Sequence, residues 1–390
     1  MVAGFRQTAG LDYDPQGTYS PMTEPTTLRL ILSIANALDF ELDHLDIKTA
    51  YLNAELPEKE RFYCSPPAGF KVPAGNGLFV TKGLYGAHQN GAAWSTSFRG
   101  SMKKRAPQFK EAGNERCVYI MRVKADGTPV DLDIERGISL EEGEKLVIIV
   151  MNTDNMLIAY TKNAKSFVDD FERILNESFE ATPREKVEYY MGTHIVRDRE
   201  RGYLGFNARR HVYNFIWNMG RDPESATGVS TPLDPHETYT KEDCPTEVDI
   251  KLRGKVWAAH GILIHLSIWA RPDLAHAVSV LGRYVHNPSE KLWAAYDRIA
   301  KYLIKTKDIR IGFGSRDDVA QAPPADMRRH FLREHVELKN VTTPDVRTDA
   351  MVVDCMTNQT PKPTHSRHLA TIFGNQNTDL PLKPIVKLVE

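Results

Sequence analysis

Apolar positions along the first part of the chain follow two different periods, which predict a helix and then a strand. Between Leu28 and Leu38 the apolar residues recur at three- and four-residue spacing, so they share one helical face. We expect this helix to follow Pro25, with Thr26 as its cap. Residues 40–47 then alternate apolar and polar side chains, which predicts a strand that ends near Asp46.

A hairpin is the clearest local prediction in the middle of the chain. Residues 146–151 and 156–160 are apolar runs, and residues 152–155 between them are rich in turn formers. The continuous apolar character predicts a strand pair buried on both faces. Residues 57–79 contain several Pro and Gly and are expected to be irregular. Apolar residues at helical spacing, or a scarcity of helix-breaking residues, predict further helices over residues 89–102, 167–175, 255–281 and 290–305.

Composition places the chain among ordinary proteins with a core. It has 390 residues, of which 41% are hydrophobic and 26% charged, enough for about two or three structural units. Apolar runs of about 18 residues are absent, and the start lacks the run of a secretory signal, so we expect an intracellular protein of the cytoplasm or nucleus, without a membrane. Its four cysteines are far apart, which indicates neither a disulfide framework nor a zinc knuckle.

Net charge does not by itself suggest a nucleic-acid binder. The formal net charge is -1, whereas neutralising phosphates requires clustered Lys and Arg. Short basic groups occur at residues 103–105, 209–211 and 328–330, and each is typical of a solvated face.

Two acidic residues are the strongest candidates for chemistry. Asp46 at a strand end and Asp154 in a hairpin turn would each usually be structural when taken alone. Nucleotidyl transfer, however, needs carboxylates that converge on two Mg²⁺ ions roughly 3.5 to 4 Å apart. A strand end beside a buried hairpin turn is one rigid way to bring such groups together.

Several segments carry a family resemblance in the right order. LDIKTAYLN at residues 45–53 resembles the first catalytic motif of reverse transcriptases from copia-type LTR retrotransposon Pol polyproteins, and SPPAGF at 65–70 resembles the segment that follows. GLYGAHQNGAAW at 83–94 and VMNTDNMLIA at 150–159 are similar to the second and third motifs. ARPDLAHAVSVL at 270–281 and HNP at 286–288 resemble the connection before the ribonuclease H domain. Ordered agreement over about residues 1 to 314 is more specific than any single motif.

The resemblance implies roles for individual residues. Asp46 and Asp154 would be catalytic carboxylates that bind Mg²⁺, or Mn²⁺ in its place, and the carbonyl of Ile47 would assist. Tyr51 would lie under the incoming sugar and exclude a 2′-hydroxyl, and Gln89 would lie over nucleotide and template. The alternatives are a core aromatic for Tyr51 and an exposed helix residue for Gln89. Implied partners are an RNA or DNA template with its primer and deoxynucleoside triphosphates.

The sequence departs from the family pattern at four motif positions. Asn155 stands where the family has its second hairpin Asp, so this catalytic position carries a neutral and weaker metal ligand. Asn152 replaces the family's Tyr, and Gly91 and Ala92 replace the usual Pro and Arg. An acidic insertion at residues 131–144 would repel a template backbone if it lay nearby.

The fold that the resemblance implies is α+β, a right-hand polymerase palm with partial fingers followed by a helical thumb or connection region. Its domains would be N-terminally truncated fingers and palm at residues 1–235, a helical connection at 236–315, and a remnant of the ribonuclease H C-terminal part at 316–390. We expect that remnant to be largely disordered, and we expect no ribonuclease H activity. The basic fingers strand of the family would also be missing.

The functional hypothesis is therefore an RNA-directed DNA polymerase whose activity is reduced or lost. A rival hypothesis is a module derived from a retroelement that binds nucleic acid or a protein without catalysis. A third is the product of a decaying gene copy that has no role. Oligomeric state, template preference and membership of a longer polyprotein are left open by the sequence.

Overall fold

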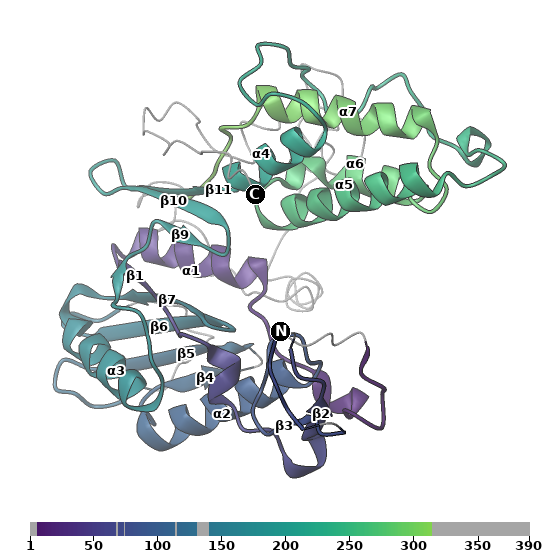
Figure 1. Cartoon of the computed structure of the whole chain (residues 1–390). Coiled ribbons are helices and arrows are strands. Elements are labelled where there is room, and N and C mark those ends of the chain that lie inside the picture. The colour runs from purple at the N-terminus through teal and green to yellow at the C-terminus, as the bar shows by residue number, and fades with distance from the viewer. Residues whose placement is uncertain (1–5, 68, 74, 114, 131–139, 314–390) are drawn as a thin grey trace, which may run out of the picture. The chain divides into compact units, whose positions relative to one another are not determined.

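The computed structural model describes residues 6–67, 69–73, 75–113, 115–130 and 140–313 (Figure 1). The chain forms two compact units, Met1–Val187 and Glu188–Glu390, which are described one at a time. The boundary falls inside the predicted fingers and palm domain of residues 1–235, because a strand at residues 203–207 pairs with one at residues 311–313. The predicted domains remain predictions, and the segment 316–390 lies outside the described residues.

A six-stranded antiparallel sheet forms the centre of the first unit. Its order is β4-β5-β6-β7-β1-β8. The strands are β1 (Glu41–Asp46), β4 (Lys110–Ala112), β5 (Glu115–Val123), β6 (Lys145–Asn152), β7 (Asn155–Tyr160) and β8 (Glu185–Lys186). The predicted strand ending at Asp46 and the predicted hairpin are both confirmed, and the hairpin strands are buried along almost their whole length.

Helices cover both faces of this sheet, as Figure 1 shows for α2 and α3 on one side and α1 on the other. Alternate side chains such as Leu45, Met151 and Met156 share a buried apolar cluster with residues of α2 (Asn90–Arg105) and α3 (Lys165–Ser178). The opposite face carries Leu157 and Val150, both fully buried. The strand period of two therefore divides the sheet between two helical layers.

Helix α1 (Pro25–Ala37) begins two residues earlier than a cap at Thr26 predicts. Pro25 occupies its first turn and Glu24 the cap position, so the prediction that Thr26 caps the helix is wrong. Proline is well suited to the first helical position because its missing N–H would have no partner there anyway. The predicted apolar face is confirmed, since Leu28, Ile31, Leu32 and Ala35 are buried.

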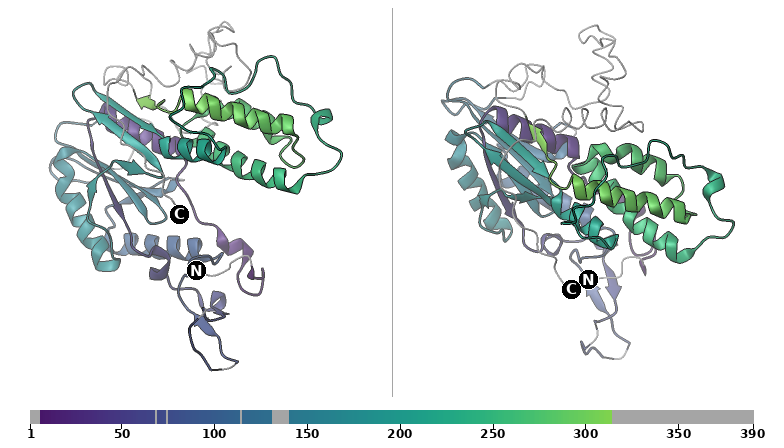
Figure 2. Two further views of the ribbon diagram at one scale, coloured as in Figure 1. Left: turned by 45° about the horizontal axis from the view of Figure 1, so that its top comes forward. Right: turned by 90° about the horizontal axis from the view of Figure 1, so that it is seen from above.

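Short elements lie within or at the end of residues 57–79, which were expected to be irregular. Strands β2 (Phe62–Cys64) and β3 (Leu78–Val80) form a separate two-stranded sheet. Figure 2 shows this hairpin projecting from the sheet and helices of the first unit. Single turns of 3-10 helix lie at Pro15–Thr18 (η2), Ala50–Asn53 (η3), Glu58–Glu60 (η4) and Lys162–Ala164 (η6).

The second unit combines a small sheet with four helices within its described residues, 188–313. The sheet is antiparallel in the order β12-β11-β10-β9. Its strands are β9 (Tyr189–Tyr190), β10 (Thr193–Asp198), β11 (Tyr203–Asn207) and β12 (Ile311–Phe313). The helices are α4 (Arg209–Asn218), α5 (Ile250–Trp269), α6 (Ala275–Gly282) and α7 (Glu290–Lys305), with 3-10 turns η7 (Lys241–Asp243) and η8 (Pro272–Leu274). Of the described helices, none is both long and apolar enough to cross a membrane.

The predicted single helix over residues 255–281 is wrong, because the chain breaks between α5 and α6. Pro272 lies at this break, where its ring disfavours helical geometry at the preceding residue and removes a backbone donor. Arg271 and Asp273 are both buried and form a bidentate ion pair, with Nη2 to Oδ2 at 2.8 Å. This pair also receives the Tyr302 hydroxyl at 2.6 Å, so it joins the break to α7.

Candidate active site

Asp46 and Asp154 meet where β1 ends beside the turn of the β6–β7 hairpin. Strands β1 and β7 are antiparallel, and their register sets Asp46 opposite Asn155. The backbone N–H of Ile47 donates to the Asp154 carbonyl at 2.8 Å, which ties the strand end to the turn. The two acidic residues of the predicted site are therefore neighbours, although they lie more than a hundred positions apart in the sequence.

The hairpin turn is tighter than the four-residue cluster that the sequence suggested. Asn152 pairs with Asn155, so only Thr153 and Asp154 make the turn. Thr153 has φ of 59°, a left-handed conformation that costs a β-branched residue about 1 to 3 kcal/mol. The indole N–H of Trp94, on α2, donates to the Thr153 carbonyl at 2.7 Å and holds this conformation. The sequence had not indicated this role for Trp94.

The environment of Asp46 disfavours its negative charge. Burial raises its pKa, repulsion from Asp154 raises it further, and nearby His44 opposes the shift. Its Oδ1 atom is buried and has no hydrogen-bond partner within the part of the chain that the structure describes. A buried carboxylate oxygen that accepts no hydrogen bond and lies beside a second carboxylate carries a negative charge that a bound cation would stabilise.

Asn155 is held by a residue that sequence reasoning had not selected. The Nε2–H of His44 donates to the Asn155 amide oxygen at 2.6 Å. His44 lies two residues before Asp46 on β1, so both side chains share one face of the strand. That alternation was visible in the sequence, but the pairing with Asn155 depends on the register of two distant strands. The side-chain oxygen of Asn155, which is the atom that could bind a metal, is thus already engaged by His44.

Tyr85 lies near the carboxylate pair and contacts Tyr51. Tyr51 lies in η3, half-buried, and its ring meets that of Tyr85 edge-on at 4.9 Å. The pKa of Tyr85 is raised by burial, and also by the charges of Asp154, Tyr51 and Asp46. The Tyr85 ring therefore lies near the acidic groups, and it is a further residue that the sequence had not indicated.

Gln89 is fully buried, so the alternative of an exposed helix residue is wrong. Its amide Nε2 donates to the carbonyl oxygens of Glu60 at 3.0 Å and Asp12 at 3.3 Å. Its Oε1 accepts from Gln7 at 3.1 Å. These contacts tie the loop before α1 to η4 and α2, while the predicted role of Gln89 in nucleotide binding remains untested.

Gly91 fits a close approach of that same loop. A Cβ atom at this position would lie 2.7 Å from Cβ of Ser20, closer than side-chain atoms pack. The family's usual proline would therefore require the loop to move. Gly83 has a similar role, because a Cβ there would lie 2.5 Å from the Tyr51 carbonyl.

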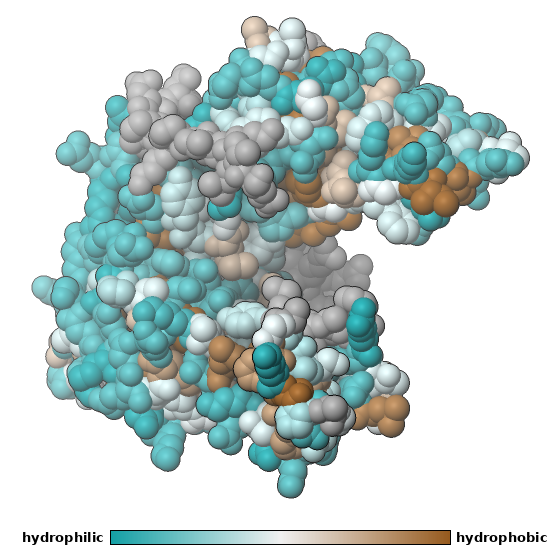
Figure 3. Space-filling view, viewed as in Figure 1, coloured by the Kyte–Doolittle hydropathy of each residue, from teal (hydrophilic) through white to brown (hydrophobic). Residues whose placement is uncertain are grey.

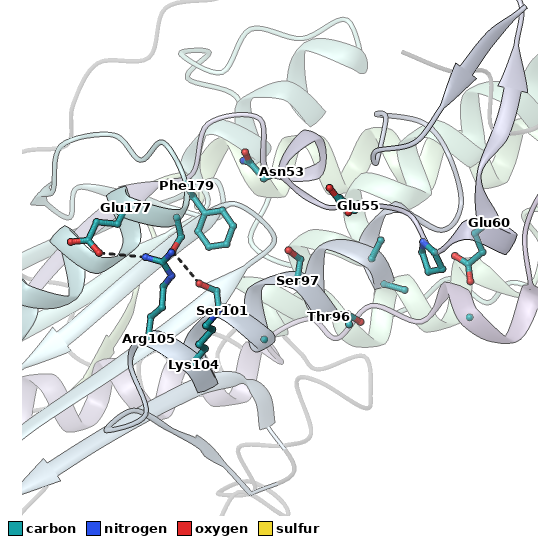
Figure 4. A pocket seen from close by; sticks show the side chains of 16 residues that line it. Asn53, Glu55, Glu60, Thr96, Ser97, Ser101, Lys104, Arg105, Glu177 and Phe179 are labelled. Carbon is teal, nitrogen blue, oxygen red and sulfur yellow. Dashed lines mark hydrogen bonds and ion pairs between the residues drawn. The ribbon is translucent and has the colours of Figure 1, made fainter.

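A cavity of about 720 Å³ lies beside α2 (Figure 4). Glu55 and Glu60 line one part of it and Lys104 and Arg105 another. Arg105 forms an ion pair with Glu177 at 3.4 Å. None of the six residues predicted for the active site lines this cavity.

Metal-binding potential at the site is limited to the two carboxylates and nearby oxygens. No cluster of three or more His, Cys, Asp or Glu that could hold a metal occurs among residues with described positions. Magnesium nevertheless binds through one or two carboxylates when substrate phosphates complete its shell. Asp46, with its unpartnered Oδ1, and Asp154 fit that requirement.

The first unit is thus an antiparallel sheet covered by helices, with two acidic groups at one end, in a chain of the α+β class. The chain belongs to the reverse transcriptase (RNA-dependent DNA polymerase) family, whose model matches residues 1–216. The resemblance to the reverse transcriptase region of copia-type retrotransposon Pol polyproteins, predicted from the sequence, is confirmed.

Relatives extend the match beyond the family model. The chain is 30% identical over 84% of its length to the retrovirus-related Pol polyprotein from transposon TNT 1-94 of Nicotiana tabacum, of which it covers 23%. It is 27% identical over 79% of its length to that from transposon RE2 of Arabidopsis thaliana, covering 19%. A putative transposon Ty5-1 protein of Saccharomyces cerevisiae is 22% identical over 71% of this chain and 80% of its own length. The chain thus spans about a fifth of the two Pol polyproteins.

Proposed function

We propose that this chain is a polymerase palm that binds a primer, its RNA or DNA template and a deoxynucleoside triphosphate at Asp46 and Asp154, but extends the primer slowly or not at all. The observation that carries the proposal is the cross-strand pair of Asp46 and Asn155 beside Asp154. Two carboxylates adjoin there, and the third acidic position holds an amide. The proposal includes a fingers region and a helical thumb or connection, as in a right-hand polymerase.

The chain's own residues would divide the work as follows. Asp46 and Asp154 would hold Mg²⁺, or Mn²⁺, and the carbonyl of Ile47 would add a ligand. When bound, the ion would activate the primer hydroxyl and stabilise the charge of the departing pyrophosphate. Tyr51, supported edge-on by Tyr85, would lie under the sugar and exclude a 2′-hydroxyl by steric overlap. Gln89 would act through its support of the loop over α2, since its amide contacts this loop.

Low activity follows from the chemistry of Asn155. An amide oxygen carries no net charge, and the amide nitrogen is a donor that no cation can use. The contact of its oxygen with His44 at 2.6 Å makes it a poorer ligand still. One negative charge is therefore missing from a site where two cations would have to approach each other.

Restoring the carboxylate is the sharpest test. The test is primer extension with Mg²⁺ or Mn²⁺, in which a primer with a recessed 3′ end lies on a longer RNA or DNA template. It would compare the unmodified chain with the single variant Asn155→Asp and with the double variant Asn155→Asp, Asp154→Asn. We expect the single variant to gain roughly 10- to 100-fold in metal affinity and in extension, by analogy with the loss that follows when a supporting group of a metal site is mutated. The double variant should lose that gain.

Two results would contradict the proposal. Robust synthesis by the unmodified chain would show that Asn155 is not limiting. Primer and template binding without extension, unchanged in Asn155→Asp, would instead favour the rival function of a non-catalytic nucleic-acid binding module.

A further inference from the structure

The hairpin of β2 and β3 has two very different faces. Its register pairs Phe62 with Val80 and Tyr63 with Phe79. Phe62 is buried against Leu56 and Ala87, and Val80 packs on the same cluster. This inner face anchors the hairpin to the rest of the first unit, so the hairpin has a fixed place there.

The outer face presents two aromatic rings to solvent. The exposed fractions of Tyr63 and Phe79 are 73% and 51%. Their ring centroids lie 4.8 Å apart and their planes are tilted by 38°. Figure 3 shows apolar residues at the surface in the region where Figure 1 labels these strands. A phenylalanine ring has no polar atom to satisfy in water, so this pair leaves apolar surface uncovered.

The charged residues within this hairpin are cationic, although the acidic Glu55 forms a β-bridge with Lys82. Every charged residue from Arg61 to Lys110 is a lysine or an arginine, although the whole chain has a net charge of -1. Lys82 lies two residues after the end of β3 and Lys71 lies in the loop that joins the two strands, and both are exposed. Exposed aromatic rings beside cations, with no acidic residue between them in sequence, are the combination that binds single-stranded nucleic acid.

We propose that the outer face of the β2–β3 hairpin is a stacking platform for unpaired bases, with Tyr63 and Phe79 under the bases and Lys71 and Lys82 on the phosphates. The inference rests on the proposed function only in that a template strand is the natural source of such bases. Bases of any sequence have a π-face, so the platform would bind single strands with little sequence preference.

Fluorescence anisotropy with the full chain tests this platform. The probes are a labelled oligothymidine of about 15 nucleotides, near the upper site size of single-strand binding folds, and a blunt duplex of the same length. We expect Tyr63→Ala with Phe79→Ala to weaken single-strand binding by about 5- to 150-fold for each base that loses its ring. Binding to the duplex should not change.

Matched variants separate stacking from folding and from charge. Tyr19→Ala removes another exposed aromatic, 71% exposed and outside the hairpin, and should leave binding unchanged. Tyr63→Trp should retain it, since a larger ring still stacks. Lys71→Ala should lower the salt dependence of single-strand binding, because the loss of one phosphate contact means that about one counterion fewer is released on binding. The aromatic variants should leave this salt dependence unchanged. Circular dichroism would verify that each variant is folded.

Three outcomes would overturn the inference: no single-strand binding by the unmodified chain, full binding by the Tyr63 and Phe79 variant, or an equal loss on duplex and single strand. In the second case the two rings only stabilise the hairpin. The proposed polymerase function is tested separately, because Asn155→Asp acts on extension and not on the hairpin. Failure of one proposal is therefore distinguishable from failure of the other.

Discussion

The buried ion pair of Arg271 and Asp273 makes a sharp prediction about the second unit. Asp273 is fully buried, and it accepts two hydrogen bonds from Arg271 and one from Tyr302. Arg271 also donates to the Thr306 carbonyl at 3.0 Å, at the end of α7. Arg271→Ala would leave the Asp273 charge buried without its partner. Breaking such a pair costs about 3 to 5 kcal/mol, because the remaining charge has neither water nor a counterion.

Urea unfolding followed by circular dichroism measures this loss directly. For a domain of about 150 to 250 residues, such a change also lowers the melting temperature by about 6 to 20 °C. The matched control is Arg283→Ala, an exposed arginine beyond α6, expected to change stability by no more than about 0.5 kcal/mol. Replacing both partners, Arg271→Met with Asp273→Leu, should recover part of the loss, since no charge is left behind. An Arg271→Ala variant as stable as the control would refute the reasoning.

Two further predictions concern titrating groups. Asp154→Asn should lower the pKa of Asp46, because it removes a like charge that raises this pKa. Carbon NMR of the Asp46 carboxyl group would follow the titration. An unchanged midpoint would mean that the two groups do not interact. In the second unit, His211 and His265 lie with ring centroids 4.6 Å apart, and burial lowers the pKa of both from 6.5. The unfolded chain therefore binds more protons, so this contribution to stability is present above pH 6.5 and is lost as the pH falls through that value. Urea midpoints from pH 7.5 down to about pH 5.5 should decrease, and the decrease should become smaller in His211→Asn with His265→Asn; an equal slope in both proteins would contradict it.

Local sequence pattern was enough to predict most elements near the site. The strand ending at Asp46, the buried hairpin and α7 follow from alternation and from helical spacing, which depend on neighbouring residues alone. The pattern failed at Pro272, where a short break interrupts an otherwise helical run. It also placed the cap of α1 at Thr26, one residue inside the helix. Both errors concern ends of helices, where a single backbone group decides the boundary.

Motif order by itself determined the family and the two acidic residues that would bind metal, because each motif is a short run read directly from the chain. Tertiary structure alone decided what surrounds them. The contact of His44 with Asn155, the support of Thr153 by Trp94 and the proximity of Tyr85 to both carboxylates join residues that are distant in sequence. Such contacts depend on strand register and on the packing of α2, and those are properties of the whole sheet rather than of any segment.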